Sequence, residues 1–312
     1  MKINDLIFKE LIKRKYYTEN KTRVWNLADS KLWYLTPSQA QGFLDLENNE
    51  KYKQSVANTE MSLIKESMPN ILKKLTNKFY NVIDLGCGDG SKAAIIIKEL
   101  YKVLKVRYCP IDISAHMVSK AAETIRTLKL GEVVEFKWNI SDFENLTNVT
   151  PLFREDDFQS HFLMLLGDTL GNFDRDDILS EIKDSMSVND VLMIGESLYI
   201  ANEAELVEPY KNPLLDTFLV KVIEQVGLTK NDVAYDVRFN KSRVEMFYRV
   251  RTNKTVKHLN KKIDFKEEDI ILVAISYRFT KHDLTNYLKR FFSNVTIFTN
   301  KGASYSVALC SM

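Results

Sequence analysis

Residues 82–93 read VIDLGCGDGSKA, and this stretch decides the fold class of the 312-residue chain. The apolar run up to Leu85 predicts a short buried strand, and Ser91 is a plausible cap for a helix over residues 91–104. Three glycines fill the turn between them: Gly86, Gly88 and Gly90. Glycines in such a turn let a ligand approach the backbone, and the amides at the start of the helix point toward it. The stretch therefore predicts either a ligand-binding turn or simply a tight connection.

The residues around this stretch repeat the same rhythm of strand and helix. The expected strands are 80–86, 106–114, 133–141, 161–169 and 190–199, and helices are expected over 115–129 and 174–186. Strands that alternate with helices imply a parallel, doubly wound sheet that is buried on both faces. This explains why the last two strands are almost continuously apolar.

The rhythm changes after Tyr199. We expect a helix over 212–227 and then a hairpin of strands 233–240 and 243–252 around Asn240-Lys241-Ser242. A helix over 280–292 restores the first pattern, and strands 294–300 and 304–312 are joined too tightly for a crossover, so they must be antiparallel. The sequence thus predicts an α/β, Rossmann-like parallel sheet that ends in an antiparallel hairpin and carries an α+β insertion.

The N-terminal part has apolar residues at helical spacing, and we expect it to be helical to about Asn77, with a break at Met68-Pro69-Asn70. The predicted organisation has four parts: a helical segment (1–60), the nucleotide-binding core (61–200), an insertion (201–277), and a helix and hairpin that complete the core sheet (278–312).

Composition weighs against several classes of function. Lys and Arg number 44 against 42 Asp and Glu, so the net charge of +2 favours neither nucleic acid nor an anionic membrane as a partner. The three cysteines, Cys87, Cys109 and Cys310, lack metal-ligand spacing and indicate a reducing compartment, with no metal site. No apolar run approaches the roughly 20 residues of a membrane span. We expect a cytoplasmic protein.

Acidic residues near the glycine turn favour one nucleotide cofactor over another. Asp112 ends the second strand, where a carboxylate can accept both hydroxyls of a ribose. Asp89 would repel the pyrophosphate of a dinucleotide, and the glycine spacing differs from the dinucleotide fingerprint. S-adenosylmethionine (SAM) has no phosphate and carries two cationic groups, so Asp84 and Asp89 suit it better.

Asp142 and Phe143 follow the third strand, where they can contact an adenine, although Asp142 could equally be a helix cap. The residues assigned to the SAM site are Asp84, Gly86, Gly88, Gly90, Lys92, Asp112, Asp142 and Phe143.

A second stretch, LLGDTLGNF at residues 165–173, follows the fourth strand. Asn172 there is either a turn residue or a group that holds a substrate. Gly171 lets the chain turn at the carboxyl end of the strand, where open α/β sheets bind ligands, and this favours a substrate role for Asn172.

Together, VIDLGCGDGSKA, YCPIDIS and SDF resemble class I SAM-dependent methyltransferases. In order, LLGDTLGNF, DVLMIGESL, VEPYKN, RVEMFYRV and AISYRF resemble the histidine Nα-methyltransferase family of ergothioneine biosynthesis, as does NEKYKQSVANTEMSLIKE ahead of the core.

The resemblance implies methyl transfer to an α-amine, with a substrate domain built from the N-terminal segment and the insertion. Asn172 and Tyr210 match the residues that hold the substrate carboxylate, and we assign them the catalytic positioning. Tyr52, and by a looser match Tyr34, would contact the substrate. The pair Glu245-Met246 would line the pocket, together with Ser276.

Two positions depart from the family pattern. Ala274 stands where the family has a glutamate that hydrogen-bonds the imidazole of histidine. Losing a charged partner for a buried ring nitrogen typically costs about 1.5 to 3 kcal/mol, which argues against histidine as the substrate. Asp168 stands where the family usually has serine, and it changes the charge of the pocket.

The sequence therefore predicts a SAM-dependent N-methyltransferase acting on an amino acid or related small amine. The alternatives are a protein or RNA methyltransferase and a SAM-binding protein without catalysis. No general base is assigned, because none of the four histidines, His116, His161, His258 and His282, lies in a motif.

Overall fold

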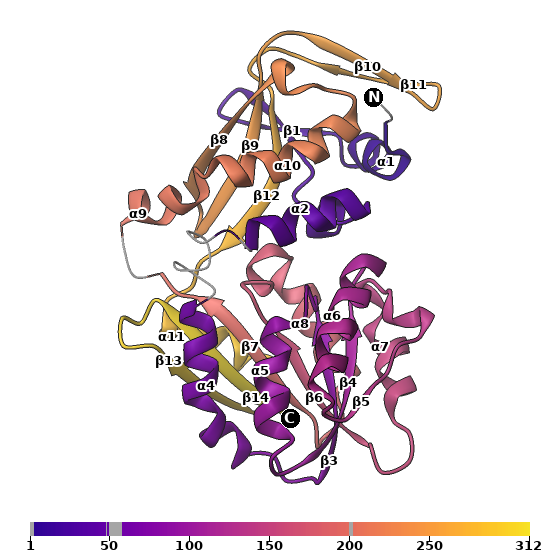
Figure 1. Cartoon of the computed structure of the whole chain (residues 1–312). Helices are drawn as coiled ribbons and strands as arrows, with labels where there is room; N and C mark the ends of the chain where they lie inside the picture. Colours follow the sequence, from indigo (N-terminus) through magenta and orange to yellow (C-terminus); the bar gives the residue numbers. More distant parts are fainter. Residues whose placement is uncertain (1–2, 48, 50–57, 200–201) are drawn as a thin grey trace. The chain divides into compact units, whose positions relative to one another are not determined.

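The computed structural model describes residues 3–47, 49, 58–199 and 202–312, and Figure 1 shows their secondary structure along the chain. The chain forms two compact units. The five-stranded unit comprises Met1–Leu35 and Ala201–Arg278, and the seven-stranded unit comprises Thr36–Ile200 and Phe279–Met312. The insertion expected at 201–277 therefore shares a unit with the first 35 residues, whereas the described residues from 36 to 60 belong to the other unit.

The sheet of the seven-stranded unit is parallel except where it ends. Its strands, in spatial order, are β13 (Asn294–Thr299), β14 (Tyr305–Ser311), β7 (Val191–Ser197), β6 (Ser160–Leu165), β3 (Phe79–Leu85), β4 (Lys105–Ile111) and β5 (Glu132–Val133). Strand β14 runs antiparallel to both of its neighbours, and the pairs from β7 to β5 are parallel. The predicted parallel sheet with a terminal antiparallel hairpin is confirmed.

The order of the strands reverses between β3 and β6. From β3 the chain proceeds outward to β4 and β5, and it then returns to add β6 and β7 on the other side. The carboxyl ends of strands at such a switch point form the crevice in which open α/β sheets bind ligands. The glycine turn follows β3 and the Asn172 loop follows β6, so both lie at this edge.

The helices of this unit are α2 (Pro37–Glu47), α4 (Asn58–Leu72), α5 (Ser91–Leu100), α6 (Ala115–Leu128), α7 (Leu146–Val149), α8 (Arg175–Ser185) and α11 (Lys281–Leu288). Helix α4 packs against α5, and α5 packs against α6 (Figure 1). Their buried faces are apolar, as the helical spacing of their residues predicts. Among the described residues, no helix is long and apolar enough to cross a membrane.

The third predicted strand, 133–141, is wrong over most of its length. Only β5 pairs with β4 as a regular strand, and the chain then makes a 3₁₀ turn at Lys137–Asn139. The buried Asn139 side chain explains this, because its oxygen accepts from the Phe136 amide at 2.7 Å and its nitrogen donates to the Pro110 carbonyl at 2.7 Å. Side-chain bonds of this kind replace the regular ladder of a strand.

The prediction that the N-terminal part, to about Asn77, is helical throughout is also wrong. Helix α1 (Asp5–Arg14) is followed by the hairpin of β1 (Tyr16–Glu19) and β2 (Thr22–Asn26). The predicted break at Pro69 is wrong as well, since α4 runs through it to Leu72. Pro69 lies in the last turn of the helix, and the burial of Met68 and Ile71 on either side of it holds that turn against the core.

The sheet of the five-stranded unit combines the first residues of the chain with the insertion. Its order is β1, β2, β12 (Ile270–Tyr277), β9 (Arg243–Val250) and β8 (Val233–Asn240). Strand β2 pairs parallel with β12, and the other pairs are antiparallel. The predicted hairpin of β8 and β9 is confirmed, with Lys241 and Ser242 both at positive φ in its two-residue turn. A second hairpin joins β10 (Lys254–His258) to β11 (Lys261–Phe265).

The remaining elements of this unit are the 3₁₀ segments Ser30–Trp33, Glu208–Tyr210 and Lys230–Asp232 and the helices α9 (Glu203–Val207) and α10 (Pro213–Val226). Helix α10 packs against α1 and β12. Asn212 caps its start and Gly227 ends it in the left-handed conformation, as the predicted range 212–227 requires.

Candidate active site

The glycine turn after β3 is built from glycines with two different tasks. Gly86 donates its amide to the Ile111 carbonyl at 2.8 Å, and a Cβ added to it would lie 3.5 Å from the Phe143 ring. A Cβ on Gly90 would come within 2.9 Å of the Ala121 backbone in α6. Gly90 is thus needed for helix packing, whereas Gly86 borders the space beside Phe143. The binding role of Gly90 stays a prediction.

Asp112 lies directly after β4, as the sequence predicts. It is buried, and its carboxylate accepts from the Ser114 amide at 2.9 Å. Burial raises its pKa to about 6, against the hydrogen bonds from neighbouring amides that lower it. Above that pH it is an ionised acceptor that can receive the hydroxyls of a ribose.

Asp142 and Phe143 follow the irregular segment after β5. Asp142 accepts from the Glu144 amide at 3.4 Å, so it caps a short 3₁₀ turn. The Phe143 ring packs against Phe173 with centroids 5.4 Å apart and lies beside Gly86. An aromatic face next to the glycine turn is the surface that an adenine ring would need.

Asp84 is a buried acid at the end of β3. It accepts from the Tyr108 hydroxyl at 2.7 Å, and burial raises its pKa to about 7 in spite of that bond and the nearby Lys92 ammonium. Such an acid is half ionised near neutral pH, and a cation placed beside it would favour its charged form.

Lys92, in the first turn of α5, is paired with two acids that sequence reasoning missed. Its ammonium lies 3.2 Å from a Glu60 oxygen and 3.6 Å from a Glu47 oxygen. Nothing in the local sequence marks these glutamates, because their significance depends on the packing of α2 and α4 beside α5.

The loop after β6 carries Asp168 and Asn172. Asp168 has a φ of 60°, and its two oxygens accept from the amide and the hydroxyl of Ser197 at 2.6 and 2.7 Å. Asp168, which stands where the family usually has serine, therefore connects this loop to the end of β7 through two hydrogen bonds. Asn172 ends a 3₁₀ turn and is half-buried.

In the five-stranded unit, Tyr210, Ser276, Ala274 and Met246 come together. The Tyr210 hydroxyl donates to Ser276 Oγ at 3.1 Å and accepts from the Arg278 guanidinium, and Tyr235 donates to the Tyr210 carbonyl at 2.9 Å. Ala274 is paired with Met246 across β12 and β9. A bulge at Val273 shifts the register between Leu272 and Ala274, so Ala274, Ser276 and Met246 share one face of the sheet.

The prediction that Glu245 lines the pocket with Met246 is wrong. Neighbouring residues of a strand face opposite sides of the sheet. Glu245 is fully buried on the other face, where it accepts from Arg238 at 2.7 Å and from Arg243 at 2.5 Å. Its role there is to neutralise two arginines.

Tyr34 and Tyr52 have different outcomes. Tyr34 is half-buried in the five-stranded unit beside Trp33 and Phe218, with ring centroids 6.2 and 6.1 Å away. Tyr52 lies outside the described residues.

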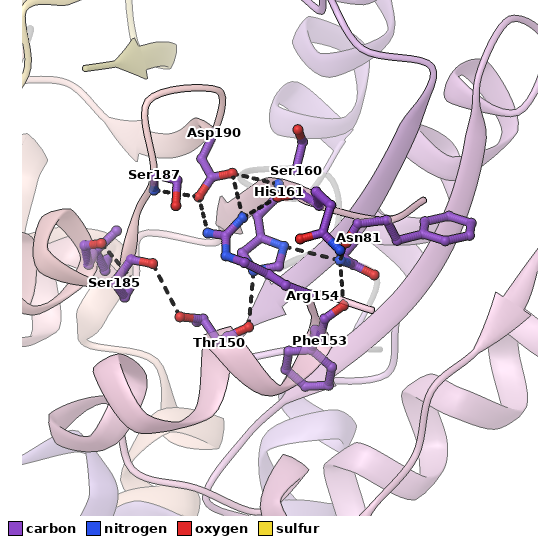
Figure 2. Close-up of polar contacts among 12 residues, drawn as sticks. Asn81, Thr150, Phe153, Arg154, Ser160, His161, Ser185, Ser187 and Asp190 are labelled. Atoms are coloured by element: carbon purple, nitrogen blue, oxygen red, sulfur yellow. Dashed lines mark hydrogen bonds and ion pairs between the residues drawn. The ribbon is translucent and has the colours of Figure 1, made fainter. Parts of the chain in front are cut away.

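The four histidines make hydrogen bonds outside the predicted site residues in the described part of the chain. His161 is buried in a polar network that includes Asn81, Thr150, Arg154 and Asp190 (Figure 2). His116, His258 and His282 bond to Gln41, Asp5 and Asn286. The three cysteines are buried and free, and no group of three or more His, Cys, Asp or Glu among the described residues could hold a metal ion.

A family model described as histidine-specific, SAM-dependent methyltransferase matches residues 43–312. The chain belongs to this family. The chain is 24% identical over 228 residues to ergothioneine biosynthesis protein 1 of Schizosaccharomyces pombe (strain 972 / ATCC 24843). That match covers 70% of this chain and 27% of the relative, so the chain spans about a quarter of the relative's length.

Two solved structures of methyltransferases are also similar to this one. A SAM-dependent methyltransferase from Clostridium acetobutylicum ATCC 824 is 15% identical, with 87% of this chain and 98% of that chain covered and a TM-score of 0.45. Human N-acetylserotonin methyltransferase in complex with SAM is 14% identical, with 88% and 60% covered and a TM-score of 0.38.

Three residues of the seven-stranded unit have the chemistry that SAM, the cofactor of this family, would need. A Cβ at Gly86 would enter the space beside Phe143, and the carboxylates Asp84 and Asp112 stand at the ends of β3 and β4. Asp112 can accept the hydroxyls of a ribose, and Asp84 suits a ligand that carries cationic groups. We therefore expect SAM to bind along this edge of the sheet.

Proposed function

We propose that this methyltransferase transfers methyl groups to the amine of an amino acid or a related small molecule, and that histidine is a poor acceptor. One observation carries the proposal: the sheet face that holds the bonded hydroxyls of Tyr210 and Ser276 also holds the buried methyl of Ala274. Hydroxyls can bind the polar groups that amino acids share. A methyl group offers no partner to an imidazole N–H.

Two residues are proposed to position the acceptor. The Asn172 amide and the Tyr210 hydroxyl can each donate a hydrogen bond to a substrate carboxylate. Arg278 donates to the Tyr210 oxygen, so the phenol proton is directed away from the guanidinium and toward an acceptor such as Ser276 Oγ. A substrate carboxylate would compete for that proton and would also be attracted by the positive charge of Arg278.

Bound SAM supplies an electrophilic methyl group on a sulfonium. The main task of the protein is then to align the amine nitrogen with that methyl group, and such positioning accounts for much of the rate of a bimolecular step. A free α-amine has a pKa near 8, so about a tenth of it is neutral at pH 7 without a strong base. The proposal therefore assigns no histidine as a general base.

The test is a methyl-transfer screen with SAM over the free amino acids and a cell extract, read by mass so that one, two or three added methyl groups are counted. The expected result is methylation of at least one free amine other than histidine, with Tyr210→Phe raising the KM for that amine. Methylation of a protein or RNA in the extract with no free amine modified would overturn the proposal.

A further inference from the structure

Glu60 is a fully buried acid on α4. Most of the buried residues around it on the same helix are apolar, including Leu63, Ile64, Met68 and Ile71. A carboxylate in such surroundings destabilises a protein unless it is paired and hydrogen-bonded. Its position therefore calls for a partner.

The two oxygens of Glu60 contact two different parts of the proposed site. One oxygen accepts from the Gly167 amide at 2.8 Å, and the other lies 3.2 Å from the Lys92 ammonium. Gly167 begins the loop that carries Asp168 and Asn172, and Lys92 lies in the first turn after the glycine loop. One buried side chain thus connects the segment after β6 to the segment after β3.

The surrounding backbone leaves room for these charged groups. A Cβ on Gly195 of β7 would lie 2.6 Å from the Glu60 oxygen and 2.9 Å from the Tyr305 hydroxyl. A Cβ on Gly167 would lie 2.5 Å from the Lys92 nitrogen. Any other residue at either position would displace the pair, so the sheet and the loop are both shaped around it.

We infer that Glu60 is a positioning residue that holds the Lys92 ammonium beside the cofactor loop and fixes the backbone of the loop that carries Asn172. The inference rests on the proposed site, in which Lys92 contacts SAM and Asn172 contacts the acceptor. The side chain of Glu60 needs no contact with either ligand. Its effect on SAM binding passes through Lys92, and its effect on the loop passes through the Gly167 amide.

The charges around Lys92 support this role. Glu47 and Glu60 both face the ammonium, and the Lys92 charge in turn acts on Asp84 and lowers the pKa of that acid against the effect of burial. By holding Lys92 in place, Glu60 therefore also influences how far Asp84 is ionised, next to a cofactor that carries a sulfonium and an ammonium.

The test is a double-mutant cycle on the full chain, with S-adenosylhomocysteine as the probe in isothermal titration. Glu60→Gln has the same shape and keeps an oxygen for the Gly167 amide, but it loses the ion pair. Glu60→Gln and Lys92→Met are each expected to raise the Kd by about tenfold, and the double variant is expected to bind no worse than Lys92→Met. Additive effects would overturn the inference. Unchanged binding by Lys92→Met would overturn it as well, and that result does not depend on whether Glu60→Gln folds.

The loop is tested separately by hydrogen exchange. Glu60→Ala removes the acceptor of the Gly167 amide, so faster exchange is expected in a peptide covering residues 166–173, while Glu60→Gln should restore the protection. Glu66→Gln changes an exposed acid on the same helix and serves as the control for both experiments. Unchanged exchange in Glu60→Ala would contradict the loop part of the inference. Neither readout needs a methyl acceptor, so failure of the proposed substrate class would be seen independently in the amino acid screen.

Discussion

Ala274 is the residue that we expect to select the side chain of the substrate. The residue is buried and shares its sheet face with Met246 and Ser276. Ser276 is already bonded to Tyr210, so the described contacts on this face provide hydroxyls and apolar surface. The choice among amino acids then depends on which side chain can pack against a methyl group without needing a charged partner.

Ala274→Glu should increase kcat/KM for histidine by about tenfold or more relative to Ala274→Gln, because a carboxylate can accept a charge-assisted bond from the imidazole. The two variants have nearly the same size, so the comparison removes the effect of filling the pocket. Initial rates with histidine and with the best amine from the screen provide the measurement. Equal rates for the two variants would show that this position does not select the side chain.

The ionised form of the buried Asp84 side chain lowers the stability of the protein, so its effect depends on pH. Its pKa is about 7 in the folded chain, compared with an ordinary value of 3.8. Because the folded pKa is the higher one, the folded state holds the proton more tightly than the unfolded state does. The corresponding stability is present below pH 4 and is lost as the pH rises through 7.

Asp84→Asn should therefore be more stable than the parent at pH 8, by up to about 4 kcal/mol, and the gain should shrink toward pH 4. The asparagine oxygen can still accept from Tyr108. Thermal unfolding without cofactor at both pH values gives the measurement, with the exposed Asp157→Asn as the control. A gain of the same size at both pH values would show that ionisation of Asp84 is not the cause.

In strand β9, neighbouring side chains face opposite sides of the sheet, so we expect one of them to stabilise the protein and the next to contact the substrate. Met246 faces the side of the sheet that carries Tyr210 and Ser276, whereas Glu245 faces the side where Arg238 and Arg243 neutralise it. A motif that reads as two adjacent pocket residues is thus divided between two faces.

Glu245→Ala should destabilise the protein by about 3 to 5 kcal/mol, because it removes a buried acid from two arginines. The KM for the amine should stay within twofold in the protein that remains folded. Met246→Ala should raise that KM and cost about 2 to 5 kcal/mol of unfolding free energy. Urea unfolding and steady-state kinetics on both variants distinguish the two faces, and a large KM change in Glu245→Ala would contradict the assignment.

Elements with strong local patterns were predictable from the sequence, and elements that depend on distant partners were not. The glycine turn, the apolar strands β6 and β7 and the hairpin of β8 and β9 carry their own signals. Strand β2 pairs with β12, more than 240 residues away, and nothing near it in the sequence reveals that partner. Glu60 was missed for the same reason, since only packing brings it to Lys92 and Gly167.

The seven-stranded unit holds buried ionisable groups at both ends of its sheet. Asp84 lies at the carboxyl end of β3, and His161 lies near the amino end of β6 in the network of Figure 2. His161 bonds through one ring nitrogen to the Thr150 carbonyl at 3.0 Å, and the other nitrogen faces the Asn81 amide at 3.3 Å. The first nitrogen therefore carries the proton of a neutral ring, and the second accepts.

Burial lowers the pKa of His161 to about 4 from its ordinary 6.5, although the nearby Asp190 carboxylate acts in the opposite direction. The folded state therefore resists protonation of this ring. The contribution of neutral His161 to the free energy of unfolding is fully present above pH 6.5 and falls as the pH drops toward 4, by about 3 kcal/mol. Asp84 acts in the opposite sense over nearly the same range, so the contributions of the two groups largely cancel between pH 4 and 6.5.

His161→Gln should remove the part of the acid loss that comes from the ring. Glutamine can replace the bonds to Thr150 and Asn81 but cannot take up a proton, so the variant should be less stable than the parent at pH 7 and should lose less on going to pH 4.5. The measurement is the difference in unfolding free energy between variant and parent, from urea titrations at several pH values, because titration of the other carboxylates cancels in that difference. Parallel curves would mean that the network tolerates a charged His161, with Asp190 supplying the compensating charge.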